Sequence, residues 1–239
     1  MEYTILEGEL LFFSKHYQIA LLEIEVDVQF QIEIPPFGSY PKYGHELFTL
    51  AREHKELSLM VRRGTISQLQ EYLGLHHHLL FVEYELPACG AGGPVVDRSG
   101  DVVGMSYHHA DGSSTILSIS TVLSCVDMWT SSDVLLAPCL VCALRMWSLV
   151  ISLLMRSTLI LPLGILALED NVIVSFNGQC PTPLPEFEDL LLSCGLAHLH
   201  GTHTEVDFKL EVHDPLQDIK RSITLRVPFT DVSKDLAED

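Results

Sequence analysis

The chain has 239 residues, which is enough for one large domain or two small ones. Hydrophobic residues make up 47% of it and charged residues 19%, a balance that excludes a disordered chain and predicts a sizeable core. The net charge of −18 argues against contacts with nucleic-acid phosphates, so we expect no nucleic-acid partner and a solvated acidic surface.

Cysteine usage and the first residues bear on the compartment of the protein. Six cysteines are too few for a disulfide scaffold in a chain of this length, so reduced thiols are expected. Cys139 and Cys142 have the spacing of a metal or redox pair, but no second pair completes a site. We therefore favour buried small side chains there and expect no metal and no cofactor. The acidic N-terminus is neither a secretory signal nor a typical transit peptide, which predicts an intracellular protein of undefined compartment.

The most apolar stretch of the chain is 139–168. Arg145 and Arg156 interrupt it, and Pro162 and Gly164 break it. A membrane-spanning helix needs about twenty uninterrupted apolar residues. We therefore predict no membrane partner. Attachment through this stretch is a minority hypothesis, which solubility without detergent would test.

Short β-strands separated by turns are predicted through the first 130 residues. Apolar residues recur there in runs of strand length, with β-branched and aromatic side chains prominent. The predicted strands cover 3–13, 17–28, 44–50, 57–67, 79–84 and 115–120. The Pro- and Gly-rich segment 35–44 is expected to be a connection, and Thr121 is expected to cap a short helix that ends at Trp129.

Three groups of histidines invite a metal-site interpretation. His76, His77 and His78 would alternate between faces in extended backbone and could not share one ion comfortably, so a loop tip is predicted. His108 and His109 are expected in an exposed turn without a chemical role. A solvated loop after a helix is favoured for the third group, which comprises His198, His200 and His203.

A glycine-dense turn runs from Ala88 to Gly93 and leads directly into a β-branched strand. A polar turn and a second strand that ends at Gly104 follow. Because glycine permits positive φ and close backbone approach, such a loop can direct several backbone N–H groups toward one point. The segment 88–104 is therefore predicted to carry the functional site.

The pattern of residues 88–104 resembles the Gly-x-Ser-Gly-Gly-Pro nucleophile loop of trypsin-like serine proteases, in particular of their Deg/HtrA (protease Do-like) branch. In that family the serine belongs to a Ser-His-Asp triad. Ala91 stands at its place, and a methyl group cannot attack a carbonyl. The resemblance also implies an oxyanion-hole loop of backbone N–H groups around Cys89, Gly90 and Ala91. A displaced Cys89 thiol as nucleophile is a minor alternative.

A second matching segment, Gln18–Ile24, resembles the Asp-Leu-Ala-Leu-Leu-Lys-Val/Ile strand of the same family. Its first residue is the triad aspartate in the family, and Gln18 occupies that place here. An amide accepts a hydrogen bond but cannot stabilise an imidazolium by charge. The family's general-base histidine lies further upstream, and His16 is too close to Gln18 to replace it. The resemblance thus implies an N-terminally truncated peptidase domain with no intact catalytic residue, its degenerate positions being Ala91 and Gln18.

The C-terminal part has a different pattern. Residues 169–179 resemble the Gly-Asp-Val-Ile-x-x-Val/Ile-Asn-Gly hairpin of PDZ domains, with Asn177 and Gly178 supplying the positive φ of a tight turn. An amphipathic helix and two strands are predicted after it. These elements cover 185–194, 204–212 and 222–229.

A PDZ domain behind the peptidase domain is the layout of Deg/HtrA proteases. We therefore predict a trypsin-like peptidase domain over 1–130, in which segment 35–44 connects two barrels, and a PDZ-like domain over 135–232. The segment 140–163 is too short for the usual opening of a PDZ domain. The peptide groove is accordingly predicted to be incomplete.

Together these features predict a mainly β protein: a truncated trypsin-like double β-barrel followed by a small α+β PDZ-like domain. The resemblance identifies the chain as a degenerate, plant-type member of the Deg/HtrA proteases. The predicted function is that of a pseudoprotease that serves as a protein- or peptide-interaction module. The alternative is an active serine endopeptidase in protein quality control. Protein or peptide ligands are the expected partners, and a homo-oligomer is left open.

Overall fold

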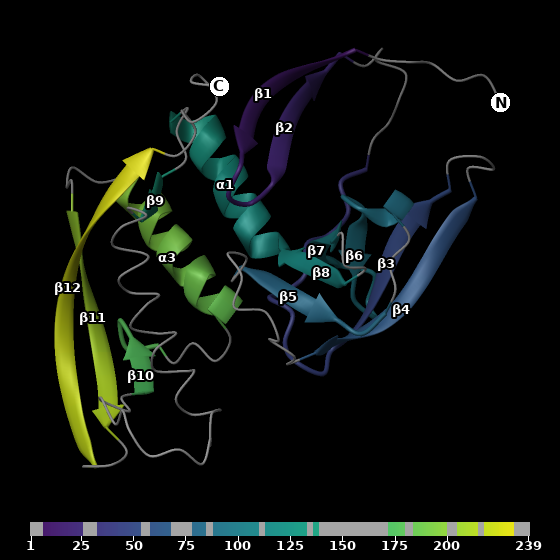
Figure 1. Ribbon diagram of the computed structural model, residues 1–239. Coiled ribbons are helices and arrows are strands. Elements are labelled where there is room, and N and C mark those ends of the chain that lie inside the picture. The colour runs from purple at the N-terminus through teal and green to yellow at the C-terminus, as the bar shows by residue number, and fades with distance from the viewer. Residues whose placement is uncertain are drawn as a thin grey trace. The chain divides into compact units, whose positions relative to one another are not determined.

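The computed structural model shows a mainly β protein that divides into two compact units, Met1–Asp133 with Ser233–Asp239 and Val134–Val232. Each unit is described by itself (Figure 1). The structure describes residues 7–25, 33–53, 58–67, 78–84, 88–109, 113–132, 136–138, 172–179, 184–199, 205–214 and 218–231. The predicted mainly β fold class is confirmed, and the first unit contains a closed barrel.

Six strands of the first unit form a closed barrel. In barrel order they are β3 (Glu46–Arg52), β4 (Leu59–Ser67), β5 (Leu79–Val82), β8 (Ser114–Ser118), β7 (Val102–His108) and β6 (Pro94–Val96). Alternate residues of β3 are buried, as expected of a strand that faces a core on one side only. The apolar core inside the barrel consists of Leu47, Ile66, Leu80, Val82, Val95, Val103 and Ile116.

A separate two-stranded sheet precedes the barrel in the chain. It is an antiparallel hairpin of β1 (Gly8–Ser14) and β2 (Ile19–Ile24). Within the described residues, the predicted double barrel is thus represented by one closed barrel and this hairpin. The Phe12 ring stacks on the ring of Trp129 at a centroid distance of 5.5 Å, which fixes the hairpin beside α1 (Ile119–Ser132) (Figure 1).

The connection at 35–44 runs along strand β7. Val102 donates its N–H to the carbonyl of Pro36 at 2.9 Å, and Gly38 donates to the carbonyl of Val102 at 2.8 Å. These bonds satisfy backbone groups of β7 that would otherwise need another strand as partner.

The N-cap of helix α1 lies three residues before the predicted cap. Ser118 accepts the N–H of Thr121 on its Oγ at 3.2 Å, so Ser118 is the N-cap and Thr121 is the third residue of the helix. The predicted cap at Thr121 is therefore wrong, because Ser118, a buried serine at the end of β8, already accepts the N–H of Thr121 within the first turn of the helix. Trp129, the predicted last residue, lies inside the helix, which continues to Ser132.

The second unit combines one sheet with one helix among its described residues. The sheet order is β10 (Val172–Phe176), β11 (Glu205–Asp214), β12 (Ile219–Asp231) and β9 (Leu136–Pro138). The helix α3 spans Leu184–Leu199. Asn177 and Gly178 have φ values of 48° and 81° and close the predicted tight turn after β10. The strands and helix predicted in this part are confirmed, whereas their assignment to a PDZ domain stays a prediction.

Several predicted features lie outside the described residues. These are the apolar stretch 139–168, the pair Cys139 and Cys142, and the histidines His76, His77, His200 and His203. The helices that the structure does describe are too short or too polar for any of them to cross a membrane.

Candidate functional site

The glycine-dense loop folds as a tight turn in front of strand β6. Residues Ala88–Gly90 form a single 3₁₀ turn, and Ala91 and Gly92 continue it into the strand. Ala91 is exposed at the tip, Cys89 is half-buried and Gly90 is buried. The methyl group of Ala91 is thus the side chain that the tip presents to solvent.

Two glycines are required by the backbone of this loop. Gly92 has a φ of +77°, a conformation that residues with a side chain rarely adopt. A Cβ on Gly93 would overlap the carbonyl oxygen of Leu50 and lie 3.0 Å from that of Gly90. The loop therefore packs directly on the backbone of β3, and only a glycine allows this approach.

Ser106 of β7 binds the loop through its backbone and its side chain. Gly92 donates its N–H to the carbonyl of Ser106 at 2.7 Å, and Ser106 donates its own N–H to the carbonyl of Gly93 at 3.0 Å. The Ser106 Oγ lies 2.6 Å from the carbonyl oxygen of Gly90 and 3.0 Å from that of Gly93, so its single proton serves both. Ser106 is fully buried. These bonds set the path of the loop.

Sequence analysis did not identify Ser106. The available signal was a serine two residues after Gly104 in a strand whose neighbouring residues are apolar, since a buried hydroxyl needs a partner. The sequence could not show that its partners would be two carbonyls of the loop 90–93.

Gln18 lies in the turn between β1 and β2, with its side chain exposed and a φ of +53°. Tyr107 Oη donates a hydrogen bond to the carbonyl of Tyr17 at 2.9 Å and lies 3.3 Å from that of Gln18. Ser106 and Tyr107 are consecutive in β7, so their side chains point to opposite faces of the strand. One residue of β7 thus holds the Ala91 loop and the next holds the Gln18 turn.

Burial raises the pKa of Tyr107 well above its ordinary value, and the nearby Cys125 raises it further. The phenol therefore stays protonated and remains a hydrogen-bond donor to the turn at every physiological pH.

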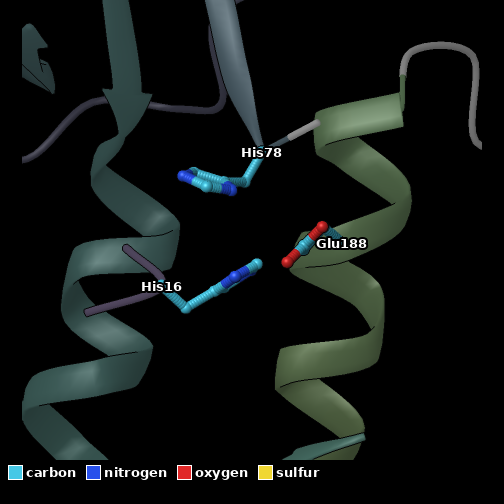
Figure 2. Close-up of side chains that lie close together, drawn as sticks. All are labelled: His16, His78 and Glu188. Carbon is cyan, nitrogen blue, oxygen red and sulfur yellow. The ribbon is translucent and has the colours of Figure 1, made fainter. Parts of the chain in front are cut away.

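The Gln18 turn has a second anchor, formed by two histidines that lie far apart in the sequence. The His16 and His78 rings lie beside one another at a centroid distance of 4.8 Å (Figure 2). The Tyr17 ring lies 5.2 Å from that of His78. His78 is only 2% exposed and immediately precedes β5. The prediction of a loop tip is therefore wrong for His78, because the hairpin turn covers it. Sequence analysis did not anticipate this pairing.

The other described histidines of the three predicted groups lie in or directly after β7 and in α3. His108 is exposed at the end of β7, and His109 Nε2 lies 2.8 Å from the Thr115 Oγ1. His198 belongs to the last turn of α3. The prediction that His198 lies in a loop is therefore wrong, because the helix extends five residues beyond its predicted end at Cys194.

An ion-pair group braces the strands that carry the loop. Glu46 of β3 binds the guanidinium groups of Arg98, in the turn after β6, and of Arg63 in β4. The hydrogen bond from Arg98 is the largest cause that lowers the pKa of Glu46 below its usual value, and the Arg63 guanidinium lowers it further. The carboxylate is committed to this group, which joins β3, β4 and the turn after β6.

A family model for the trypsin-like peptidase domain matches residues 2–105. No curated protein matches the sequence. The match covers the hairpin, the loop and most of the barrel, and it bears out the predicted resemblance to trypsin-like peptidases.

The chain is also similar to three solved structures. A serine endoprotease from Yersinia pestis is 12% identical, with 95% of this chain and 76% of that chain covered and a TM-score of 0.48. Deg5 is 17% identical, with 53% and 62% covered and a TM-score of 0.45. The protease domain of MamO from Magnetospirillum magneticum, in its apo form, is 19% identical, with 49% and 66% covered and a TM-score of 0.39. The chain spans less than two thirds of the length of the latter two structures.

Proposed function

We propose, on the premise that residues 2–105 match a trypsin-like peptidase domain, that this domain is a pseudoprotease and serves as a protein- or peptide-interaction module. The observation that carries the proposal is Ala91. It is exposed at the tip of a loop whose backbone is held by Ser106, and its methyl group cannot form an acyl-enzyme. The alternative function, that of an active serine endopeptidase, would need a hydroxyl at this position.

The acid position supports the same conclusion. Gln18 is neutral, so it cannot stabilise the imidazolium that a triad forms during catalysis. Its side chain is exposed in a turn that β7 binds on the face opposite to Ser106. An oxyanion hole from the N–H groups around Cys89, Gly90 and Ala91 would then bind a carbonyl without cleaving the peptide.

Retention of the loop without its nucleophile favours recognition over catalysis. We propose proteins or peptides as partners, an intracellular location, and no nucleic-acid or membrane partner, which accords with the net charge of −18. The second unit is proposed to be PDZ-like. Its support is the Asn177–Gly178 turn, the helix α3 and the strand pair β11–β12, all within Val134–Val232.

Hydrolysis of casein tests the proposed lack of catalysis. The parent chain, Ala91→Ser and Ala91→Ser/Gln18→Asp are compared, with Ala20→Ser as a matched control for adding a hydroxyl at an exposed position outside the loop. We expect no cleavage by the parent or the control. Activity gained in Ala91→Ser alone or with Gln18→Asp, but not in Ala20→Ser, would assign the defect to the altered triad positions and also support the proposal. Cleavage by the parent that is lost in Cys89→Ala would overturn it and make the protein a thiol peptidase.

A further inference from the structure

The distal end of the β1–β2 hairpin exposes an apolar face. Leu10 pairs with Leu22 across the two strands, and Gly8 pairs with Ile24, so these four residues share one face. Leu10 and Leu22 are each 53% exposed and Ile24 is 48% exposed. Large apolar side chains gathered at such exposure mark an interaction surface more often than an ordinary solvated face.

The same hairpin turns its other face toward the body of the unit. Leu21 is adjacent to Leu22 and therefore points to the opposite face, and Phe12, the partner of Leu21, stacks on Trp129. The apolar residues Leu10, Leu22 and Ile24 thus lie on the face that is directed away from α1. This is the reverse of the usual pattern, in which the outward face of a surface hairpin is polar.

Beyond Phe12, the face shared with Phe12 and Leu21 becomes acidic. Glu9 pairs directly with Glu23, and like charges opposite each other destabilise a strand pair. Glu7 and Glu25, each two positions further along, lie on the same face just outside the strands, and all four carboxylates are exposed. The distal hairpin therefore has an apolar face and an acidic face.

Both strands of the hairpin also have an open edge among the described residues, since the sheet there contains only β1 and β2. A two-stranded hairpin is marginally stable alone, and an added strand would stabilise it through main-chain hydrogen bonds. Successive side chains of an added strand would continue the two faces in alternation.

We propose that the distal β1–β2 hairpin binds an extended polypeptide segment in which apolar and basic residues alternate, added as a third strand. Its apolar side chains cover the face of Leu10, Leu22 and Ile24, and its Lys or Arg side chains neutralise the face of Glu9 and Glu23. The inference names a partner class for the proposed interaction module and rests on that part of the proposed function. It does not depend on whether Ala91 abolishes catalysis.

Charge favours such a segment over a second copy of this chain. Edge pairing of two hairpins would bring their four-glutamate faces together, and each chain already carries a net charge of −18. A basic partner removes the repulsion between Glu9 and Glu23, whereas a second acidic copy increases it.

Fluorescence anisotropy with synthetic peptides tests the proposal. The probe is a labelled eight-residue peptide of alternating lysine and valine, and the control peptide has glutamate in place of lysine. Leu22→Ser and Glu9→Lys/Glu23→Lys remove the two recognition features. The matched controls are Leu59→Ser, an exposed leucine of β4, and Glu83→Lys/Asp127→Lys, which changes the net charge by the same amount as the hairpin double variant.

We expect the parent to bind only the lysine peptide, and each hairpin variant to bind it about tenfold more weakly than its matched control. Equal weakening in hairpin variants and controls would mean non-specific attraction to an acidic protein and would overturn the proposal. Concentration-dependent self-association that Leu22→Ser abolishes, without peptide binding, would replace it with a second copy as occupant. Casein cleavage tests only the proposed lack of catalysis, and peptide binding tests only the proposed role of the hairpin, so a failure of one proposal can be distinguished from a failure of the other.

Discussion

The loop that carries Ala91 and the hairpin that carries Gln18 are attached to the same strand in very different ways. Ser106 of β7 holds the loop with backbone and side-chain hydrogen bonds, and the backbone of the loop packs directly on β3 at Gly93. Tyr107 holds the hairpin turn with one hydroxyl, and the hairpin is otherwise fixed by ring contacts. The loop is therefore bound into the barrel by many contacts, whereas the hairpin is a separate sheet that exposes Leu10, Leu22 and Ile24 among the described residues.

Substitution of Gly93 should reveal this difference most strongly. Gly93→Ala places a Cβ against the Leu50 carbonyl, and we expect it to lower the free energy of unfolding by about 3 kcal/mol, measured by urea denaturation. Gly92→Ala is the comparison, because Gly92 has open space around its Cβ and only its φ of +77° opposes a side chain, and this variant should cost about 1 to 2 kcal/mol. Equal costs would mean that β3 does not confine the loop.

Loss of the Ser106 hydroxyl should have the next largest effect. Ser106→Ala leaves the carbonyls of Gly90 and Gly93 without their buried donor, so we expect a loss of about 2 kcal/mol in the free energy of unfolding. Ser99→Ala, in the exposed turn after β6, should change this free energy by less than about 0.5 kcal/mol. A Ser106 variant as stable as the Ser99 variant would contradict the role of Ser106 in holding the loop.

Removal of the Tyr107 hydroxyl should have the smallest effect and should act on the hairpin. Tyr107→Phe is expected to cost about 1 kcal/mol and to speed amide hydrogen exchange in β1 and β2, with little change in the loop. Faster exchange in the loop 88–93 as large as that in the hairpin would show that the two attachments are not separate.

The pH dependence of the same variant gives an independent check. The pKa of Tyr107 is raised above 10.0 in the folded protein, so folding favours the protonated phenol. The contribution of Tyr107 to the free energy of unfolding is fully present below the pKa that this tyrosine has in the unfolded chain. It is lost as pH rises from about 10 toward the pKa of Tyr107 in the folded protein. Tyr43 and Tyr84, whose pKa values are also raised by burial, retain this behaviour in Tyr107→Phe. The variant should therefore lose stability less steeply with alkaline pH than the parent.

Local patterns predicted most of the secondary structure. Apolar runs of strand length identified β3 and β4, and alternation of apolar residues identified β11. Asn177–Gly178 identified a turn that needs positive φ at both positions. These features depend on neighbours within a few residues, so they can be recognised in the sequence alone. The position of the cap at Ser118 was missed by three residues, because Ser118, Ser120 and Thr121 all have side chains that suit an N-cap.

Contacts between distant segments could not be predicted in the same way. His16 and His78 are 62 positions apart, and no local pattern indicates that their rings meet. In the sequence, Ser106 has the pattern of an ordinary strand residue. Its role depends on the position of β7 beside the loop, where its hydroxyl binds two loop carbonyls. The outward direction of Leu10 and Leu22 likewise depends on which face of the hairpin packs on Trp129.

The amino-acid sequence by itself determined the mainly β character and the glycine-dense loop, and it supplied the prediction that Ala91 and Gln18 stand at two triad positions. Composition and short-range periodicity are sufficient for these, because each is a property of consecutive residues. Only the tertiary structure decided that Ser106 holds the loop, that Tyr107 and His78 hold the Gln18 turn, and that the distal hairpin presents an apolar face outward. Those outcomes depend on barrel closure and on the packing of the hairpin against α1, which bring residues into contact that are separated by many positions along the chain.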